Sequence, residues 1–146
     1  MTHKIKNILS IVLVSALCVV IFAVPASARS SYYLSAYRAW LTAESNGKIL
    51  VTVDVQGTGD MEKIGATRIE ILESKNNGAS WTQYRVFLSS IFPEMLTSGD
   101  YLYYDTPVSF TGTPGYKYCA IVTVYARDST GSDSREYTTP MVTAKN

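Results

Sequence analysis

Apolar residues alternate with polar residues along most of this 146-residue chain, and this two-residue period constrains the fold more than any other feature. The clearest runs are residues 49–55 and 116–127; their apolar positions are Ile49, Val51, Val53, Val55, Tyr118, Ala120, Val122 and Val124. A period of two places successive side chains on opposite faces of an extended backbone, and β-branched residues favour strands. No run after residue 28 has the period of an amphipathic helix. The sequence therefore predicts an all-β domain.

About seven strands, separated by turn residues, follow from the same pattern. They are expected near residues 33–42, 49–55, 67–71, 81–88, 101–110, 116–127 and 134–143. Turns or loops are expected where Gly, Asn and Asp gather, at residues 46–47, 56–60, 76–78 and 128–132. Residues 92–96 are either a short helical turn or part of a loop. Short strands at intervals of about ten residues are typical of an antiparallel β-sandwich.

Residues 1–28 have the features of a cleavable secretory leader. Two lysines precede the apolar run of residues 8–24, and residues 26–28 (Ala-Ser-Ala) form a small-residue cleavage site. The alternative is an uncleaved membrane anchor, although a run of about 17 residues is at the short limit for a bilayer span. Cleavage after Ala28 leaves residues 29–146 as one domain, so we expect a secreted protein with no membrane contact after cleavage.

The composition of residues 29–146 excludes several classes of site. This region has no histidine and a single cysteine, Cys119. Ser-His-Asp and Cys-His catalytic arrangements, and zinc sites built from histidine and cysteine, are therefore excluded. One cysteine cannot close an internal disulfide. With 11 basic and 12 acidic residues, the region lacks the positive charge that nucleic-acid binding needs.

The carboxylates do not indicate an enzyme or a metal site. A glycoside hydrolase needs two carboxylates on opposite sides of a sugar-binding cleft. The spacing of the carboxylates in this sequence does not single out such a pair. The carboxylates considered are Asp54, Asp60, Glu62, Glu94, Asp100 and Asp105. Residues 57–62 supply two neighbouring carboxylates but no EF-hand pattern. We therefore predict a non-catalytic protein with no cofactor and no bound metal.

Residues 110–132 resemble the last two strands of fibronectin type III domains. The shared features are Pro114-Gly115, the tyrosine Tyr118, the alternating apolar strand that contains it, and a small-residue turn with Gly131. The resemblance implies an immunoglobulin-like or fibronectin type III-like β-sandwich in which Tyr118 is buried.

One feature of that family, a core tryptophan on the second strand, is missing from residues 49–55. Either Trp40 or Trp81 is expected to fill that space. The layout of a leader followed by one domain is similar to that of small secreted proteins of Gram-positive bacteria.

Residues 74–81 (Ser-Lys-Asn-Asn-Gly-Ala-Ser-Trp) resemble an Asp box, the hairpin motif Ser-x-Asp-x-Gly-x-Thr-Trp of sialidase propellers. Asn76 replaces the aspartate and Ser80 replaces the threonine. Asn and Gly tolerate a left-handed backbone, and a short polar side chain binds nearby backbone amides. The motif occurs once rather than as a repeat. We therefore expect Asn76, Gly78 and Trp81 to be structural, with no sialidase activity.

The 11 tyrosines include a cluster that is the best candidate for a ligand surface: Tyr101, Tyr103 and Tyr104 beside Asp105. Aromatic rings stack on sugars and anchor protein interfaces, and a neighbouring carboxylate supplies a hydrogen-bond acceptor. The alternative is that these tyrosines simply fill the half-buried faces of strands.

These observations favour a secreted recognition module that binds an extracellular protein or glycan. The alternative is a structural or envelope-associated spacer of the bacterial surface. We expect a monomer, because Ile121 and Tyr125 flank Cys119 and should partly bury its thiol.

Overall fold

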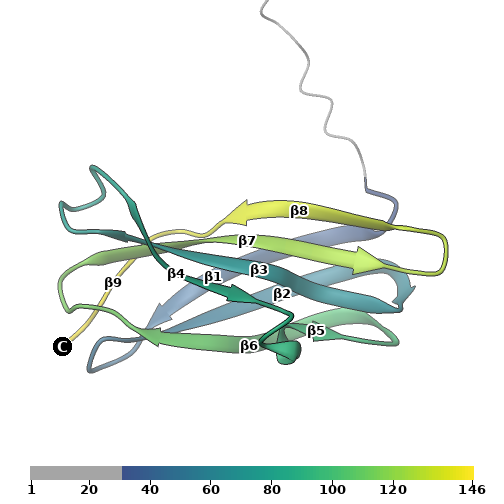
Figure 1. The fold of residues 1–146 in the computed structure, drawn as a ribbon, viewed down its shortest axis with the longest axis horizontal. Coiled ribbons are helices and arrows are strands. Elements are labelled where there is room, and N and C mark those ends of the chain that lie inside the picture. Colours follow the sequence, from purple (N-terminus) through teal and green to yellow (C-terminus); the bar gives the residue numbers. More distant parts are fainter. Residues whose placement is uncertain (1–30) are drawn as a thin grey trace, which may run out of the picture. The chain divides into compact units, whose positions relative to one another are not determined.

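The computed structural model describes residues 31–146, which form one compact unit. The expected leader, residues 1–28, lies outside the described residues. No helix within residues 31–146 has the length and apolar character needed to cross a membrane. Strands dominate this part of the chain, and its one helical element is a single 3-10 turn (Figure 1).

The described strands run in the order expected from the sequence pattern. They are β1 (Leu34–Ala43), β2 (Lys48–Met61), β3 (Lys63–Ser74), β4 (Thr82–Leu88), β5 (Leu96–Thr97), β6 (Asp100–Thr111), β7 (Lys117–Arg127), β8 (Ser132–Thr138) and β9 (Val142–Thr143). The 3-10 turn η1 (Pro93–Met95) precedes β5. Of the two interpretations of residues 92–96, the helical turn is therefore correct.

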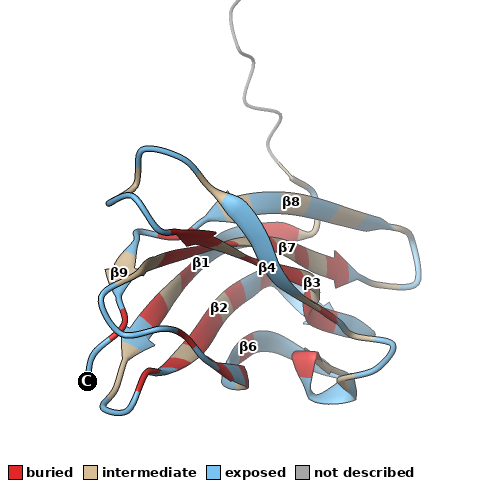
Figure 2. Cartoon of the chain, turned by 60° about the vertical axis from the view of Figure 1, so that its left-hand side comes forward, coloured by how far each residue is buried: buried red, intermediate tan, exposed pale blue. Residues whose placement is uncertain are grey.

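All the strands of residues 31–146 pair antiparallel, in two sheets. The smaller sheet has the order β1-β2-β6, and the larger has the order β4-β3-β7-β8, with β5 paired to β3 and β9 paired to β7. The two sheets face each other, and their buried residues lie between them (Figure 2). The predicted all-β antiparallel sandwich is confirmed.

The two alternating runs that were clearest in the sequence supply the middle of the core. Each lies on a central strand, β2 in one sheet and β7 in the other. Their apolar side chains are fully buried: Ile49, Val51, Val53, Val55, Tyr118, Ala120, Val122 and Val124. Burying one such aliphatic side chain contributes roughly 1.5–3 kcal/mol. The inward residues of these strands therefore hold the sheets together.

The predicted turn at Asn46-Gly47 joins β1 to β2. Both residues have positive φ, 59° and 73°, which is the backbone that two-residue hairpin turns require. The turn is closed by a hydrogen bond of 2.8 Å from the Glu44 amide to the Lys48 carbonyl. This hairpin sets the register in which Arg38 lies opposite Asp54.

The prediction of a loop at residues 56–60 is wrong, because β2 continues through these residues to Met61. Gly57 lies opposite Leu34, and the Thr58 amide donates to the Tyr33 carbonyl at 3.1 Å. A Cβ at Gly57 would lie only 2.9 Å from Cγ of Met61. Glycine here makes room for a core side chain rather than marking a loop.

Neither tryptophan occupies the core, so the expectation for Trp40 or Trp81 is wrong. Ala39 and Leu41 point inward, and alternation therefore directs Trp40 to the outer face, where it is half-buried. Trp81 precedes β4 and is half-buried at its hairpin. The core is instead filled by aliphatic side chains with Tyr118, Tyr103, Phe87 and Phe110.

Tyr118 is fully buried, as predicted, and its hydroxyl connects three segments. It donates to Oε2 of Glu73 on β3 at 2.7 Å and accepts from the Thr113 amide, in the β6–β7 connection, at 2.8 Å. Burial, followed by the hydrogen bond to Glu73, raises the pKa of Tyr118 to about 12.

Cys119 is 7% exposed on the outer face of the larger sheet, opposite Leu72 of β3. Burial raises the pKa of its thiol. The predicted partial burial of this residue is therefore confirmed.

Candidate functional site

The tyrosine cluster of residues 101–104 does not form one surface, because successive side chains of β6 point to opposite faces. Tyr103 is only 4% exposed and points into the core, where its hydroxyl donates to the Glu94 carbonyl at 2.7 Å. Tyr101 is 51% exposed. It is two residues before Tyr103 on β6, so its side chain lies on the same side of the strand as that of Tyr103. Tyr104 is 61% exposed and faces outward. Tyr103 must therefore be removed from the predicted ligand surface.

Asp105, the fourth residue of that candidate, is exposed on β6, the edge strand of the smaller sheet. Its Oδ1 accepts from the Thr106 amide at 2.7 Å. Together with Glu94 and Asp100 it lines one hollow beside β6. Asp105 therefore belongs to the edge of the sheet rather than to its outer face.

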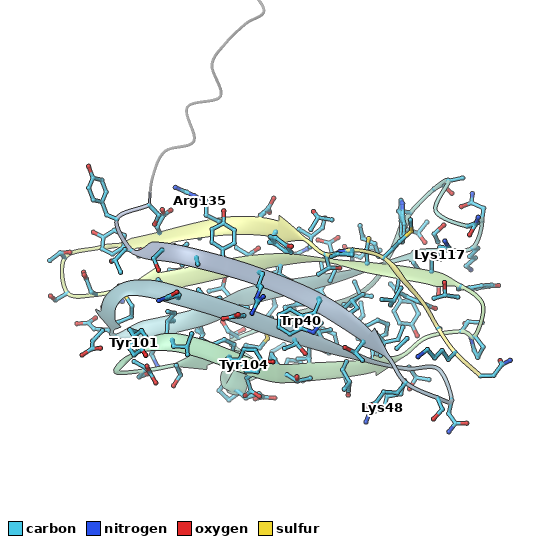
Figure 3. The ribbon with its side chains drawn as sticks, turned by 180° about the vertical axis from the view of Figure 1, so that it is seen from behind. Trp40, Lys48, Tyr101, Tyr104, Lys117 and Arg135 are labelled. Carbon is cyan, nitrogen blue, oxygen red and sulfur yellow. The ribbon has the colours of Figure 1, made fainter. Side chains whose placement is uncertain are left out.

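The outer face of the β1-β2-β6 sheet brings together two aromatic rings that are far apart in the sequence. The rings of Trp40 and Tyr104 have centroids 6.0 Å apart. The guanidinium of Arg38 lies 5.3 Å from the Trp40 ring centroid, and its Nε donates to Oδ2 of Asp54 at 2.8 Å. Figure 3 views this face, with Trp40 and Tyr104 next to each other. We call Arg38, Trp40, Asp54, Leu102 and Tyr104 the aromatic face.

Strand register explains this arrangement. Arg38 pairs with Asp54, and Asp54 pairs with Tyr104, so these residues form one row across the sheet. The next row is Ala36, Gln56 and Leu102. Sequence reasoning missed Trp40, Arg38 and Asp54 because only the β1-β2-β6 order brings them beside Tyr104. The one signal in the sequence was that Trp40 alternates with Ala39 and Leu41, which indicates that its side chain points to the face opposite theirs.

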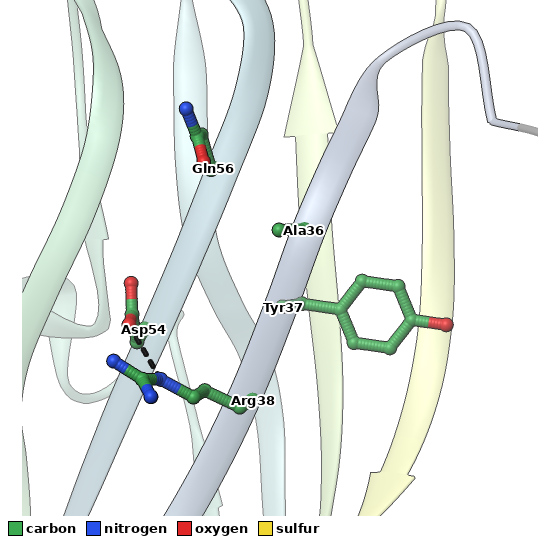
Figure 4. Close-up of a pocket in the computed structure, with 5 residues that line it drawn as sticks. All are labelled: Ala36, Tyr37, Arg38, Asp54 and Gln56. Carbon is green, nitrogen blue, oxygen red and sulfur yellow. Dashed lines mark hydrogen bonds and ion pairs between the residues drawn. The ribbon is translucent and has the colours of Figure 1, made fainter.

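Two hollows border these rows. The first, which we call the face hollow, has a volume of about 330 Å³ and is lined by Ala36, Tyr37, Arg38, Asp54 and Gln56. Figure 4 shows Arg38 reaching toward Asp54, while Tyr37 points toward β8. The short side chain of Ala36 leaves space between its larger neighbours.

The second hollow, the edge hollow, has a volume of about 280 Å³ and lies against β6. Its lining is Glu94, Leu96, Thr97, Asp100, Leu102, Tyr103, Tyr104 and Asp105. Glu94, Asp100 and Asp105 form no ion pair with any residue in 31–146. Burial, and then the negative charges of Asp105 and Glu94, raise the pKa of Tyr103. The edge hollow is therefore a region of uncompensated negative charge.

Within residues 31–146, no group of three His, Cys, Asp or Glu side chains is arranged to hold a metal ion. The aromatic face instead offers an exposed ring, a guanidinium and a carboxylate, and Gln56 in the neighbouring row adds an amide. Such groups bind by stacking and hydrogen bonding.

The Asp-box-like hairpin lies at the β3–β4 connection and is closed by side chains. Oδ1 of Asn76 accepts from the Ser80 amide and from Oγ of Ser74, both at 2.9 Å, and Nδ2 of Asn76 donates to Oγ of Ser80 at 2.8 Å. The Gly78 amide donates to Oγ of Ser74 at 2.8 Å. These hydrogen bonds hold the Asn76 side chain and the Gly78 backbone inside the turn.

Comparison with known proteins gives no family for this chain: no family model and no curated protein matches it.

Proposed function

We propose that this protein is a secreted, non-catalytic recognition module that binds its ligand with the aromatic face. The observation that carries the proposal is the contact between Trp40 and the exposed ring of Tyr104. A contiguous exposed aromatic surface is typical of binding sites. A spacer domain would need no such patch.

The fold supports a fibronectin type III-like module. The fourth strand, β4, pairs with β3 in the larger sheet, whereas in constant immunoglobulin domains the fourth strand joins the sheet of the first two. The bond from the Thr113 amide to the Tyr118 hydroxyl matches the tyrosine corner of such sandwiches, in which the tyrosine hydroxyl binds backbone a few residues upstream.

Export is supported by the leader-like residues 1–28, and the absence of histidine from residues 29–146 supports a non-catalytic role. Fold similarity alone says little about function. The proposal therefore depends on the aromatic face and not on the fold.

The test compares two exposed tyrosines on the same strand. Residues 29–146 are screened on a glycan array and against proteins of the culture medium, as wild type, Tyr104→Ala and Tyr101→Ala. Because Tyr104 lies on the aromatic face and Tyr101 on the other side of β6, capture should fall about tenfold or more in Tyr104→Ala. Tyr101→Ala should bind like the wild type.

Equal capture by Tyr104→Ala and wild type would show that the aromatic face is not the site. Failure of the wild type to capture any ligand would favour the structural spacer. Circular dichroism should give the same β spectrum for all three proteins, because both tyrosines are exposed.

A further inference from the structure

One long edge of β6 faces away from β2 and has no strand paired to it. Within residues 31–146, β6 pairs only with β2, and it forms the lower border of the smaller sheet in Figure 1. An edge strand presents backbone N–H and C=O groups that can pair with another chain. Adding an extended segment to such an edge is a recurring mode of protein recognition.

Two other outer strands, β1 and β8, offer poorer edges. On β1, the ring of Tyr37 packs edge-on against Tyr137 of β8, with centroids 6.3 Å apart, and Figure 4 shows Tyr37 pointing toward β8. On β8, three of seven residues are charged: Asp133, Arg135 and Glu136. Covered edges and charged side chains both oppose the pairing of a further strand.

The open stretch of the β6 edge is centred on Tyr104. The Leu102 amide donates to Oδ1 of Asp100 at 3.1 Å, and the Thr106 amide donates to Oδ1 of the preceding aspartate at 2.7 Å. N–H groups two residues apart on a strand point the same way. The Tyr104 amide therefore points to the same edge, and no side chain in residues 31–146 accepts from it. The residue after Thr106 is a proline, which has no N–H to offer.

A strand added to this stretch places its side chains alternately on two sides. Its residues opposite Leu102 and Tyr104 lie over the aromatic face, where both side chains are exposed. Its residues opposite Tyr103 and Asp105 lie on the other side, beside the edge hollow, which Glu94 also lines. In strand addition, backbone hydrogen bonds supply affinity and pockets for alternate side chains supply specificity.

Charge indicates which segment fits this edge. Glu94 and Asp105 have no basic partner among the described residues, so basic side chains are favoured on the side of the edge hollow. A second copy of this chain is disfavoured, because pairing β6 with β6 would bring two sets of these carboxylates together. Apolar side chains are favoured on the side of the aromatic face.

We propose that β6 accepts, as an added antiparallel strand opposite residues 102–106, an extended segment of another protein in which basic and apolar residues alternate. Its apolar side chains pack on Leu102 and Tyr104, its lysines or arginines enter the edge hollow, and its backbone pairs with that of Tyr104. Tyr101 lies outside the paired stretch. This inference rests on the proposed function, because Leu102 and Tyr104 belong to the aromatic face.

The test compares three synthetic peptides of equal length with capped ends. The first alternates valine with lysine, the second has the same composition with all valines before all lysines, and the third alternates valine with glutamate. Binding to residues 29–146 is measured by calorimetry. The alternating valine–lysine peptide should bind at least about tenfold more tightly than the other two, because only this peptide presents apolar and basic side chains on opposite sides of a strand.

Methylation of the peptide backbone tests the strand pairing itself. In the proposed complex the valine amides, opposite Leu102 and Tyr104, point toward β6, whereas the lysine amides point away from it. N-methylation of the valines should therefore weaken binding about tenfold or more. N-methylation of the lysines is the matched control and should leave binding unchanged. Exchange of the Tyr104 amide hydrogen with solvent should slow in the complex.

Variants of the protein locate the two sets of peptide side chains. Glu94→Gln/Asp105→Asn keeps the Asp105 oxygen that accepts a backbone amide, and it should weaken binding of the valine–lysine peptide about tenfold. The control Glu44→Gln/Glu136→Gln removes the same charge from other parts of the surface and should bind like the wild type. Tyr104→Ala should weaken binding by removing the apolar contact.

Equal binding of the alternating and block peptides would overturn the proposal, because it describes non-specific attraction of a polycation. Equal binding of the N-methylvaline peptide and its unmethylated parent, or no binding of any peptide, would also overturn it. So would a stable dimer of residues 29–146 that protects the Tyr104 amide. If no peptide binds but Tyr104→Ala still abolishes capture of another ligand, the strand-addition inference fails and the recognition function stands. If Tyr104→Ala leaves every capture unchanged, both fail.

Discussion

Tyr118 ties the β6–β7 connection to the centre of the larger sheet. Its ring packs on those of Tyr84 and Phe110, with centroids 5.5 and 5.4 Å away. Its hydroxyl is the hydrogen-bond donor to Glu73, whose carboxylate is itself buried. Tyr118 therefore contributes apolar packing through its ring and a hydrogen bond to the buried carboxylate of Glu73 through its hydroxyl.

Two substitutions separate these contributions. Tyr118→Ala should lower the free energy of unfolding by roughly 3–5 kcal/mol, because it leaves a cavity in the core. Tyr118→Phe keeps the ring but leaves Glu73 and the Thr113 amide without the hydroxyl, so it should cost about 1–3 kcal/mol. Urea denaturation measures both. A loss below about 1 kcal/mol for Tyr118→Ala would mean that this side chain does not pack in the core.

The raised pKa of Tyr118 makes stability depend on alkaline pH. An unfolded tyrosine releases its proton near pH 10, whereas Tyr118 in the fold does so near pH 12. Between these values the unfolded chain binds fewer protons, so the free energy of unfolding falls as pH rises. Below pH 10 this contribution is fully present.

Urea denaturation on either side of pH 10 measures this decline. It should be smaller in Tyr118→Phe, which has no phenol to ionise at this position. An identical decline in the two proteins would show that Tyr118 is not responsible.

At the scale of elements, the two-residue period predicted the strands because each central strand buries one face completely. The Asn46-Gly47 turn was predictable from local backbone preferences. The extension of β2 through Gly57 was not predictable from the sequence. Glycine at this position leaves room for the Met61 side chain, and this contact exists only in the folded chain. Alternation also separates Tyr103 from Tyr104, so sequence proximity alone was misleading for the candidate surface.

The hairpin of residues 74–81 gives a prediction at this scale. Asn76→Ala removes three side-chain hydrogen bonds from an exposed turn, and it should lower the free energy of unfolding by about 1–2 kcal/mol. The control Asn76→Asp keeps the acceptor oxygen and should lose less. Thermal unfolding followed by circular dichroism distinguishes them. Equal stability of Asn76→Ala and the wild type would rule out a structural role for these bonds.

At the scale of the whole molecule, the candidate site is a product of strand order. Trp40 comes from the first strand and Tyr104 from the sixth, and only β2 between them places their rings in contact. No local motif encodes this neighbourhood, so the sequence predicted a sandwich but not the residues that share its outer face. The same order places the uncompensated carboxylates at the free edge of β6.

Every role proposed for the aromatic face depends on Trp40 and Tyr104 lying side by side. The most direct measurement is an NMR nuclear Overhauser experiment on residues 29–146 with assigned aromatic protons. Ring centroids 6.0 Å apart predict cross-peaks between the Trp40 indole and the Tyr104 ring, and none between Trp40 and the core methyl groups of Val122. Cross-peaks from Trp40 to Val122, without any to Tyr104, would place Trp40 in the core and contradict the site.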